Sequence, residues 1–190
     1  MQNKASIIHF VYSQIYDQVI SDLSGSFDEN QSVNIKNEIN YLSEQWSDYE
    51  ERALAGLKKY SPFKFEHEQF NCYLVGSLPY TGFSDPLTIR ISKNADMDLT
   101  ITTIIHELIH IYIEPEESIY ISKVQKAFPE IADTRILLHI AVNFIEYEIL
   151  KSLFGKDKFD KIMKRELLLK GIRPAWDVVF NNEEKLKDII

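Results

Sequence analysis

The spacing of hydrophobic residues predicts helices in the first third of the chain. Over residues 5–22, apolar side chains recur every three or four positions, the period of a helix that buries one face. The same spacing runs from Ile35 to Leu57 and predicts a second, longer helix that ends at the Ser61-Pro62 break.

The spacing then changes to two, the period of a β-strand with one buried face. The predicted strands are residues 63–67, 70–75 and 87–91. His67 is expected to face outward, and residues 76–86 are rich in turn formers, which predicts a loop that exposes Tyr80 and Phe83. These strands predict a small, mostly antiparallel sheet with an edge to which an extended peptide could add.

Helical spacing returns in the second half of the chain. Asp96 or Asp98 is placed to cap a helix that ends before Glu114-Pro115. The later predicted helices are residues 129–153, residues 156–170 and a last one that begins near Pro174. The chain is therefore predicted to be a single α+β domain over residues 1–190, with N-terminal helices, a small sheet and a helical C-terminal part.

The helix that ends before Glu114 carries an H-E-x-x-H motif, with His106 and His110 as its histidines. Histidines four residues apart lie one turn apart on the same helix face, so both imidazoles can reach one metal ion. Glu107 lies next to the first histidine, where its carboxylate can take a proton from a metal-bound water. Such groups on an otherwise apolar helix are costly to bury without a partner or a function, so the motif predicts a site for one Zn²⁺ ion.

A catalytic zinc ion needs three protein ligands, so a third ligand must come from another part of the chain. Arg135, His139, Asn143 and Glu146 form one polar stripe on the apolar helix predicted at residues 129–153. Buried polar residues of this kind bond to one another or face a functional site. We predict Glu146 as the third ligand and His139 as a catalytic residue in the pocket, with His139 as the alternative ligand.

Two other sources of the third ligand fit the sequence less well. A metzincin-type site would need Gly three residues and His six residues after His110, and those positions hold Ile113 and Glu116. Glu114, Glu116 and Glu117 lie at the helix end, where exposed cap residues are expected.

The H-E-x-x-H motif, followed by a glutamate on a later helix, resembles the gluzincin group of zinc metallopeptidases, and in size its compact members. The resemblance covers residues 87 to about 154 and implies a zincin-like fold in which the two histidines and Glu146 hold zinc. Members of the group often carry an Asp or Asn near this glutamate that steadies a ligand histidine. Here Leu150 occupies the position four after Glu146, and Asn143 is the nearest substitute.

The function that the motif and the resemblance imply is zinc-dependent hydrolysis of peptide bonds. Zinc lowers the pKa of its bound water, and Glu107 acts as the general base that passes the proton to the leaving amine. The developing oxyanion needs one more donor, and the candidates are His139, Tyr112, Tyr120, Tyr147 and Arg135. The alternatives are a catalytically inactive zincin-like protein that binds a peptide or partner, and an α+β interaction domain in which the motif is accidental.

Composition limits the partners and the ligand types. A net charge of −8 argues against nucleic acid as a partner, because phosphate binding needs clustered Lys and Arg. Cys72 is the single cysteine, so any metal must be held by His and carboxylate. No apolar run approaches the roughly 18 residues of a membrane span, and the N-terminus does not resemble a signal peptide. We therefore expect a cytoplasmic protein that acts on a peptide or protein substrate.

Overall fold

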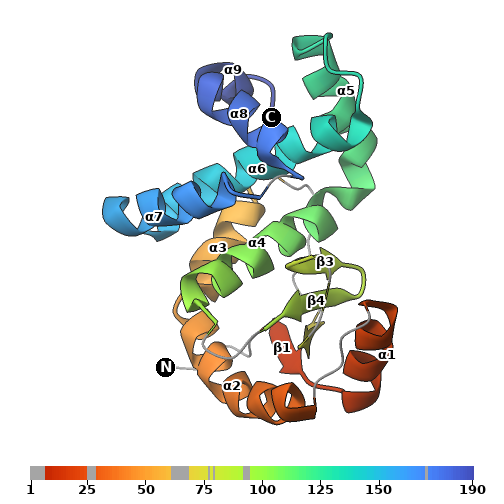
Figure 1. Cartoon of the computed structure of the whole chain (residues 1–190). Helices are drawn as coiled ribbons and strands as arrows, with labels where there is room; N and C mark the ends of the chain where they lie inside the picture. Colours follow the sequence, from red (N-terminus) through yellow and green to blue (C-terminus); the bar gives the residue numbers. More distant parts are fainter. Residues whose placement is uncertain are drawn as a thin grey trace. The chain divides into compact units, whose positions relative to one another are not determined.

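The computed structural model of the chain describes residues 7–24, 29–60, 69–76, 78, 80–91, 95–169 and 171–190. Within these residues the fold is α+β, as predicted (Figure 1). The strand predicted at residues 63–67, with His67, lies outside them. No helix in this described part of the chain combines the length and the hydrophobicity that a membrane span requires.

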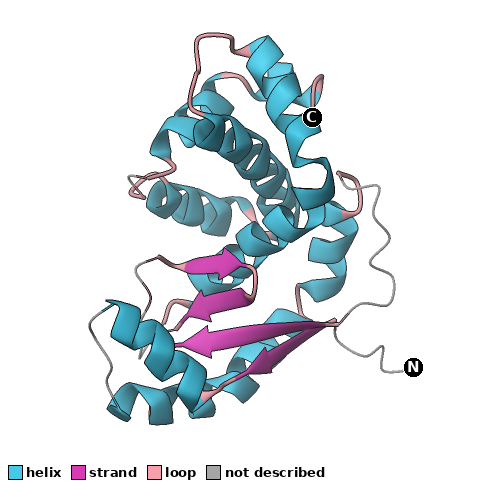
Figure 2. Cartoon of the chain, turned by 90° about the vertical axis from the view of Figure 1, so that its right-hand side faces the viewer, coloured by secondary structure: helices cyan, strands magenta, loops and turns pink. Residues whose placement is uncertain are grey.

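Four strands form one mixed sheet in the order β1-β2-β4-β3 (Figure 2). They are β1 (Ile8–Val11), β2 (Phe70–Val75), β3 (Gly82–Ser84) and β4 (Leu87–Arg90). β1 and β4 both run parallel to β2, and β3 alone of these strands pairs antiparallel, with β4. The prediction of a mostly antiparallel sheet is therefore wrong. Helices α1, α2 and α3 lie between β1 and β2, and such a crossover returns the chain in the same direction. Strand β3 lies between β2 and β4 in the chain and runs against β4, so β4 is again parallel to β2.

The prediction of a single helix over residues 5–22 is also wrong. Ile8–Val11 is strand β1, and helix α1 (Gln14–Ser24) begins only after it. The apolar residues here fit a helical period, but periodicity cannot separate a short apolar strand from a helix. The segment forms a strand because it pairs with β2, from Ile8↔Phe70 to Val11↔Tyr73.

Strand β3 lies within residues 76–86, for which a loop and no strand was predicted. Its residues pair with β4 in the register Gly82↔Ile89 to Ser84↔Leu87. Tyr80 is 71% exposed, as predicted, whereas Phe83 on β3 is half-buried. The strands of residues 70–75 and 87–91 are confirmed as β2 and β4.

The helices follow the prediction more closely than the sheet does. After α1 come α2 (Glu29–Ser47), α3 (Glu50–Leu57), α4 (Met97–Ile113), the 3₁₀ turn η1 (Glu114–Glu116), α5 (Glu117–Ala127), α6 (Thr134–Leu153), α7 (Lys156–Glu166), α8 (Arg173–Asn181) and α9 (Glu183–Lys187). The long helix expected from Ile35 to Leu57 is divided into α2 and α3 at Asp48-Tyr49. Pro174 lies in the first turn of α8, as predicted.

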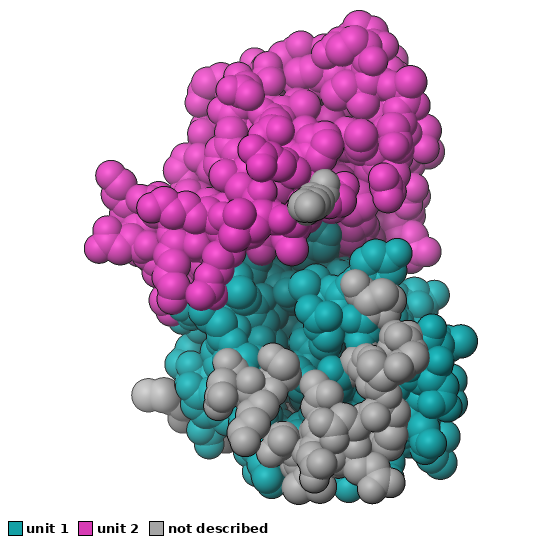
Figure 3. Space-filling model, in the orientation of Figure 1, with its two compact units in different colours: residues 1–52, 64–108 teal, residues 53–63, 109–190 magenta. Residues whose placement is uncertain are grey.

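The chain forms two compact units, residues 1–52 with 64–108 and residues 53–63 with 109–190 (Figure 3). In the first unit, the carboxylates of Asp17 and Glu50 fix helices to the sheet. Asp17 of α1 accepts a hydrogen bond from the backbone N–H of Gly76 at 2.8 Å, just after β2. Glu50 accepts from the backbone N–H of Ile8 at 3.1 Å and from the indole of Trp46 at 3.1 Å.

The second unit is built around α6, whose apolar residues are almost all buried. α5 and α8 both pack against it (Figure 1). Asp133 caps its N-terminus by accepting hydrogen bonds from the backbone N–H groups of Arg135 and Ile136. The helix therefore begins at Thr134, five residues later than the predicted start at Pro129.

Candidate metal centre

Helix α4 presents the two motif histidines on its less buried side. Asp96 caps the helix, because its Oδ1 accepts a hydrogen bond from the backbone N–H of Asp98 at 3.1 Å. The helix ends at Ile113, immediately before Glu114-Pro115, as predicted. Its fully buried apolar residues include Ile101, Ile104, Ile105, Leu108 and Ile109. His106 and His110 are half-buried, so both imidazoles lie at an accessible face of the helix.

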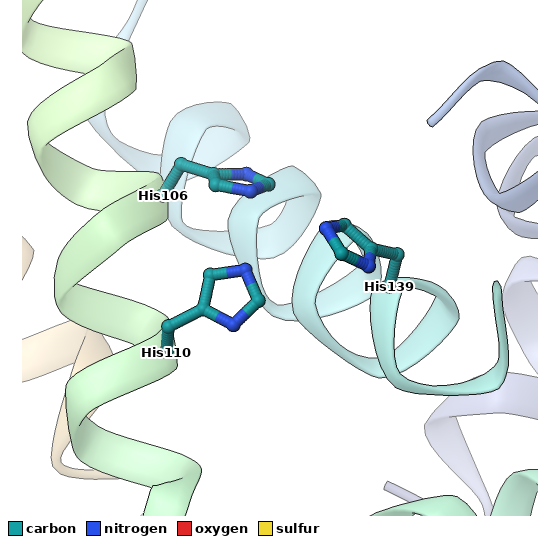
Figure 4. Close-up of side chains that lie close together, drawn as sticks. All are labelled: His106, His110 and His139. Atoms are coloured by element: carbon teal, nitrogen blue, oxygen red, sulfur yellow. The ribbon is translucent and has the colours of Figure 1, made fainter. Parts of the chain in front are cut away.

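His106, His110 and His139 form a cluster of three imidazoles (Figure 4). One ring nitrogen from each lies within 4.8 Å of the other two. The rings of His110 and His139 have centroids 5.1 Å apart and planes inclined at 65°. In a tetrahedral zinc site with Zn–N distances near 2.0–2.1 Å, the ligand nitrogens lie roughly 3.3 Å apart. To reach that spacing, the ring nitrogens would have to come up to about 1.5 Å closer together.

The orientation of the His139 ring is set by the backbone of its own helix. Its Nδ1 lies 2.8 Å from the carbonyl oxygen of Arg135, one turn earlier on α6. In the neutral tautomer that donates this bond, the proton is on Nδ1 and the lone pair is on Nε2. Metal-binding histidines typically donate their second ring N–H in this way, which fixes both tautomer and ring direction.

Glu146 lies on the same helix as His139 but deeper in the core. It follows His139 by seven residues, about 10 Å along a helix axis, and is completely buried. Among the described residues, the group able to share a metal contains His139 and not Glu146. Glu114, Glu116 and Glu117, at η1 and the start of α5, are also outside that group. The structure thus brings the alternative third ligand, rather than the preferred one, to the histidine pair.

Asn143 acts on the backbone beside His139. It is fully buried, and with its amide oriented to satisfy both neighbours, Nδ2 donates to the His139 carbonyl oxygen at 3.3 Å. Its Oδ1 then accepts from Nε1 of Trp176 on α8, also at 3.3 Å. Asn143 therefore links α6 to α8 at the turn that carries His139. Arg135, at the other end of the predicted stripe, is exposed.

Glu107 faces the sheet. Its side chain is 7% exposed, and a Cβ built at Gly82 of β3 would lie 3.1 Å from its Cγ. Burial, and secondly the negative charge of Glu107, raise the pKa of the Cys72 thiol on β2 above its usual value. The side chain of Glu107 thus lies close to the sheet. Sequence reasoning did not single out Gly82, because only the fold brings it to Glu107.

Several predicted oxyanion donors are engaged by other groups. The hydroxyl of Tyr120 donates to the carbonyl oxygen of Tyr60, and that of Tyr147 donates to Glu183 at 3.0 Å. Tyr112, on α4, is buried in the hydrophobic core. Of the five predicted donors, His139 is the one that belongs to the histidine cluster.

Comparison of the sequence with protein-family models finds no match, and comparisons with curated proteins and with solved structures find none either. A function for the chain has to be inferred from the cluster, from Glu107 and from the strand beside it.

Proposed function

We propose that the chain is a zincin-like, zinc-dependent hydrolase of peptide bonds. The observation that carries the proposal is the convergence of three imidazoles, one ring nitrogen each, within 4.8 Å. Imidazole nitrogens suit Zn²⁺ better than they suit Mg²⁺ or Ca²⁺, which prefer oxygen ligands. Three protein ligands leave one coordination position for water or substrate, the feature that separates catalytic from structural zinc sites.

The histidines fit the role of ligands in their local chemistry as well as in their number. His106 and His110 are one turn apart on α4, and His139 is oriented by the carbonyl oxygen of Arg135. Their partial exposure leaves a route for an ion and a substrate. A site held by His139 has three histidine ligands, in place of the two histidines and one glutamate of the gluzincin group. We therefore propose a zincin-like hydrolase, with the gluzincin ligand set as the competing arrangement.

Glu107 supplies the acid–base chemistry in this proposal. When bound, the zinc ion supplies a Lewis acid and a water of lowered pKa. The Glu107 carboxylate accepts a proton from the attacking water and delivers it to the leaving amine. Glu107 follows His106 directly in the chain and lies against β3 at Gly82, so a water on the bound ion would have to lie within reach of its carboxylate.

A peptide is the substrate that the neighbouring strand favours. Within the described sheet, β3 is an edge strand, and Gly82 on it lies beside Glu107. An extended peptide can add to such an edge through backbone hydrogen bonds, whatever its side chains. Addition to β3 would bring a peptide carbonyl toward the carboxylate that handles the proton. β1 is the other edge of the described sheet, separated from β3 by β2 and β4.

The experiment that tests this function compares wild type with Glu107→Gln, both isolated without chelator. We expect both proteins to hold zinc, and kcat on a set of fluorescence-quenched peptides to fall by about 10²–10⁴ in the variant. Glu114→Gln, an exposed change at the end of the same helix, is the matched control and should leave kcat unchanged. Wild type that binds zinc and cleaves none of the peptides would instead indicate a zincin-like binding protein.

A further inference from the structure

The side chain of Glu107 lies close to the sheet at Gly82. Gly82 is buried on β3 and pairs with Ile89 of β4. A Cβ at this position would lie 2.9 Å from the carbonyl oxygen of Thr88, 3.0 Å from Cδ1 of Ile89 and 3.1 Å from Cγ of Glu107. Cβ atoms essentially never come within 3.0 Å of another heavy atom, so the carbonyl oxygen of Thr88 would have to shift, and Ile89 and Glu107 would have to give by a few tenths of an ångström.

We propose that Gly82 is a positioning residue for Glu107: its missing side chain provides the space in which the proposed general base lies. This inference rests on the proposed function, because it assigns a role to the place that the Glu107 carboxylate occupies. It concerns a residue outside the histidine cluster.

Glu107 is the neighbour that an added methyl group would displace most easily. Thr88 and Ile89 belong to the central part of the sheet and are 0% and 1% exposed. The Oγ1 of Thr88 also donates to the carbonyl oxygen of Pro86 at 2.7 Å, which holds this turn in place. The side chain of Glu107 has rotatable bonds, and rotation moves its carboxylate away from β3. A methyl group at position 82 therefore turns the proposed base away from β3, in addition to the shift that its shorter contact with the Thr88 carbonyl oxygen forces on the sheet.

The first test is Gly82→Ala, with Gly171→Ala as the matched control because a Cβ there meets nothing within 4 Å. We expect Gly82→Ala to keep the zinc content and the KM of wild type within about twofold and to lower kcat about tenfold. A displacement of 1 Å at a reacting group can cost about 10²-fold, and a few tenths of an ångström correspondingly less. Unchanged kcat in a folded Gly82→Ala variant would overturn the proposal, as would an equal loss in the Gly171→Ala control.

The second test needs no activity and covers the case in which Gly82→Ala folds poorly. Gly82→Ala is introduced into wild type and into Glu107→Ala, and the fall in Tm is measured in each background. If the added methyl group displaces Glu107, the fall is smaller where the Glu107 side chain has already been removed. Equal falls in both backgrounds would show that Gly82 serves only the packing of β3 on β4, and the proposal would fail.

The two tests separate this proposal from the proposed function. Wild type that holds no zinc and cleaves no peptide contradicts the hydrolase and, with it, the catalytic role of the Glu107 position. The Tm comparison still decides in that case whether Gly82 and Glu107 are coupled. If the Tm comparison shows coupling and the enzyme is active, but Gly82→Ala leaves kcat unchanged, then only the positioning role of Gly82 is rejected.

Discussion

The Nδ1 atom of His139 lies 2.8 Å from the carbonyl oxygen of Arg135, one turn before it on α6. This bond selects the tautomer whose Nε2 carries the lone pair, and it holds the ring in the direction of His110, 5.1 Å away between centroids. A ligand oriented before the metal arrives loses less side-chain entropy on binding, so the bond favours metal binding at this histidine.

Zinc should stabilise the folded chain through the three histidines. At a free zinc concentration 100 times the Kd, binding to the folded state contributes about 2.7 kcal/mol, which raises Tm by roughly 5–10 °C for a chain of this size. Scanning calorimetry with zinc and with a chelator measures the shift, and His106→Ala is the control in which it should disappear. An equal shift in wild type and His106→Ala would place the zinc elsewhere.

Asn143 should contribute to stability through its two buried hydrogen bonds, more than to zinc affinity. Asn143→Ala removes the bonds to the His139 carbonyl and to the indole of Trp176, leaving both groups buried, and we expect a loss of about 1–3 kcal/mol in urea unfolding. Trp176→Phe should cost less when added to Asn143→Ala than when made alone, because the two residues share one bond. Additive losses would show that this bond contributes nothing.

Zinc affinity of Asn143→Ala should fall by less than about tenfold, because Asn143 bonds to the backbone of His139 and not to its ring.

The motif half of the candidate centre could be predicted from the sequence because it depends on helix geometry alone. His106, Glu107 and His110 lie on one helix, and their spacing fixes their relative positions before any tertiary contact is known. The third ligand depends on where a second helix comes nearest to this one. His139 and Glu146 share one stripe of α6 two turns apart, and the period of the sequence gives both the same direction. Only the fold shows which of them meets the pair.

The sheet, too, depends on tertiary contacts that the local sequence does not specify. Ile8–Val11 has an apolar pattern that fits either a helix or a strand, and its pairing with β2 about sixty residues later decides between them. Gly82 had no sequence signal beyond its place in a loop rich in turn formers. Its importance follows from β3, β4 and Glu107 meeting at one point, a tertiary relationship that local sequence does not encode.

The stability of the second unit should depend on pH through Glu183. Hydrogen bonds from Lys187 at 2.7 Å and from Lys151 and the Tyr147 hydroxyl, both at 3.0 Å, lower the pKa of the Glu183 carboxyl from 4.5 to about 2. Because the folded pKa lies below the unfolded one, the carboxylate stabilises the fold above pH 4.5, and this contribution is lost as the pH falls toward 2. Solvent screening of this largely exposed network limits the contribution to about 1 kcal/mol.

Glu183→Gln should therefore lower the free energy of unfolding by about 1 kcal/mol at neutral pH, and the difference from wild type should shrink between about pH 4.5 and 2. Urea unfolding at several pH values measures it. Glu184→Gln, at a carboxylate that is 89% exposed and bonded to Lys187, is the control and should show a smaller difference. A Glu183→Gln difference that stays constant over this range would contradict the lowered pKa.

Zinc binding by His139→Ala and Glu146→Gln, each compared with wild type, tests the proposed centre most directly. Protein isolated without chelator is analysed for zinc, and Kd is measured by competition with a chelator of known affinity. We predict about one zinc per wild-type chain and a loss in affinity of more than about 100-fold in His139→Ala, since even partners of metal ligands contribute 10–100-fold. Glu146→Gln should stay within about tenfold of wild type. Less than about a tenth of an equivalent of zinc in wild type, or zinc lost from Glu146→Gln and kept by His139→Ala, would contradict the three-histidine centre.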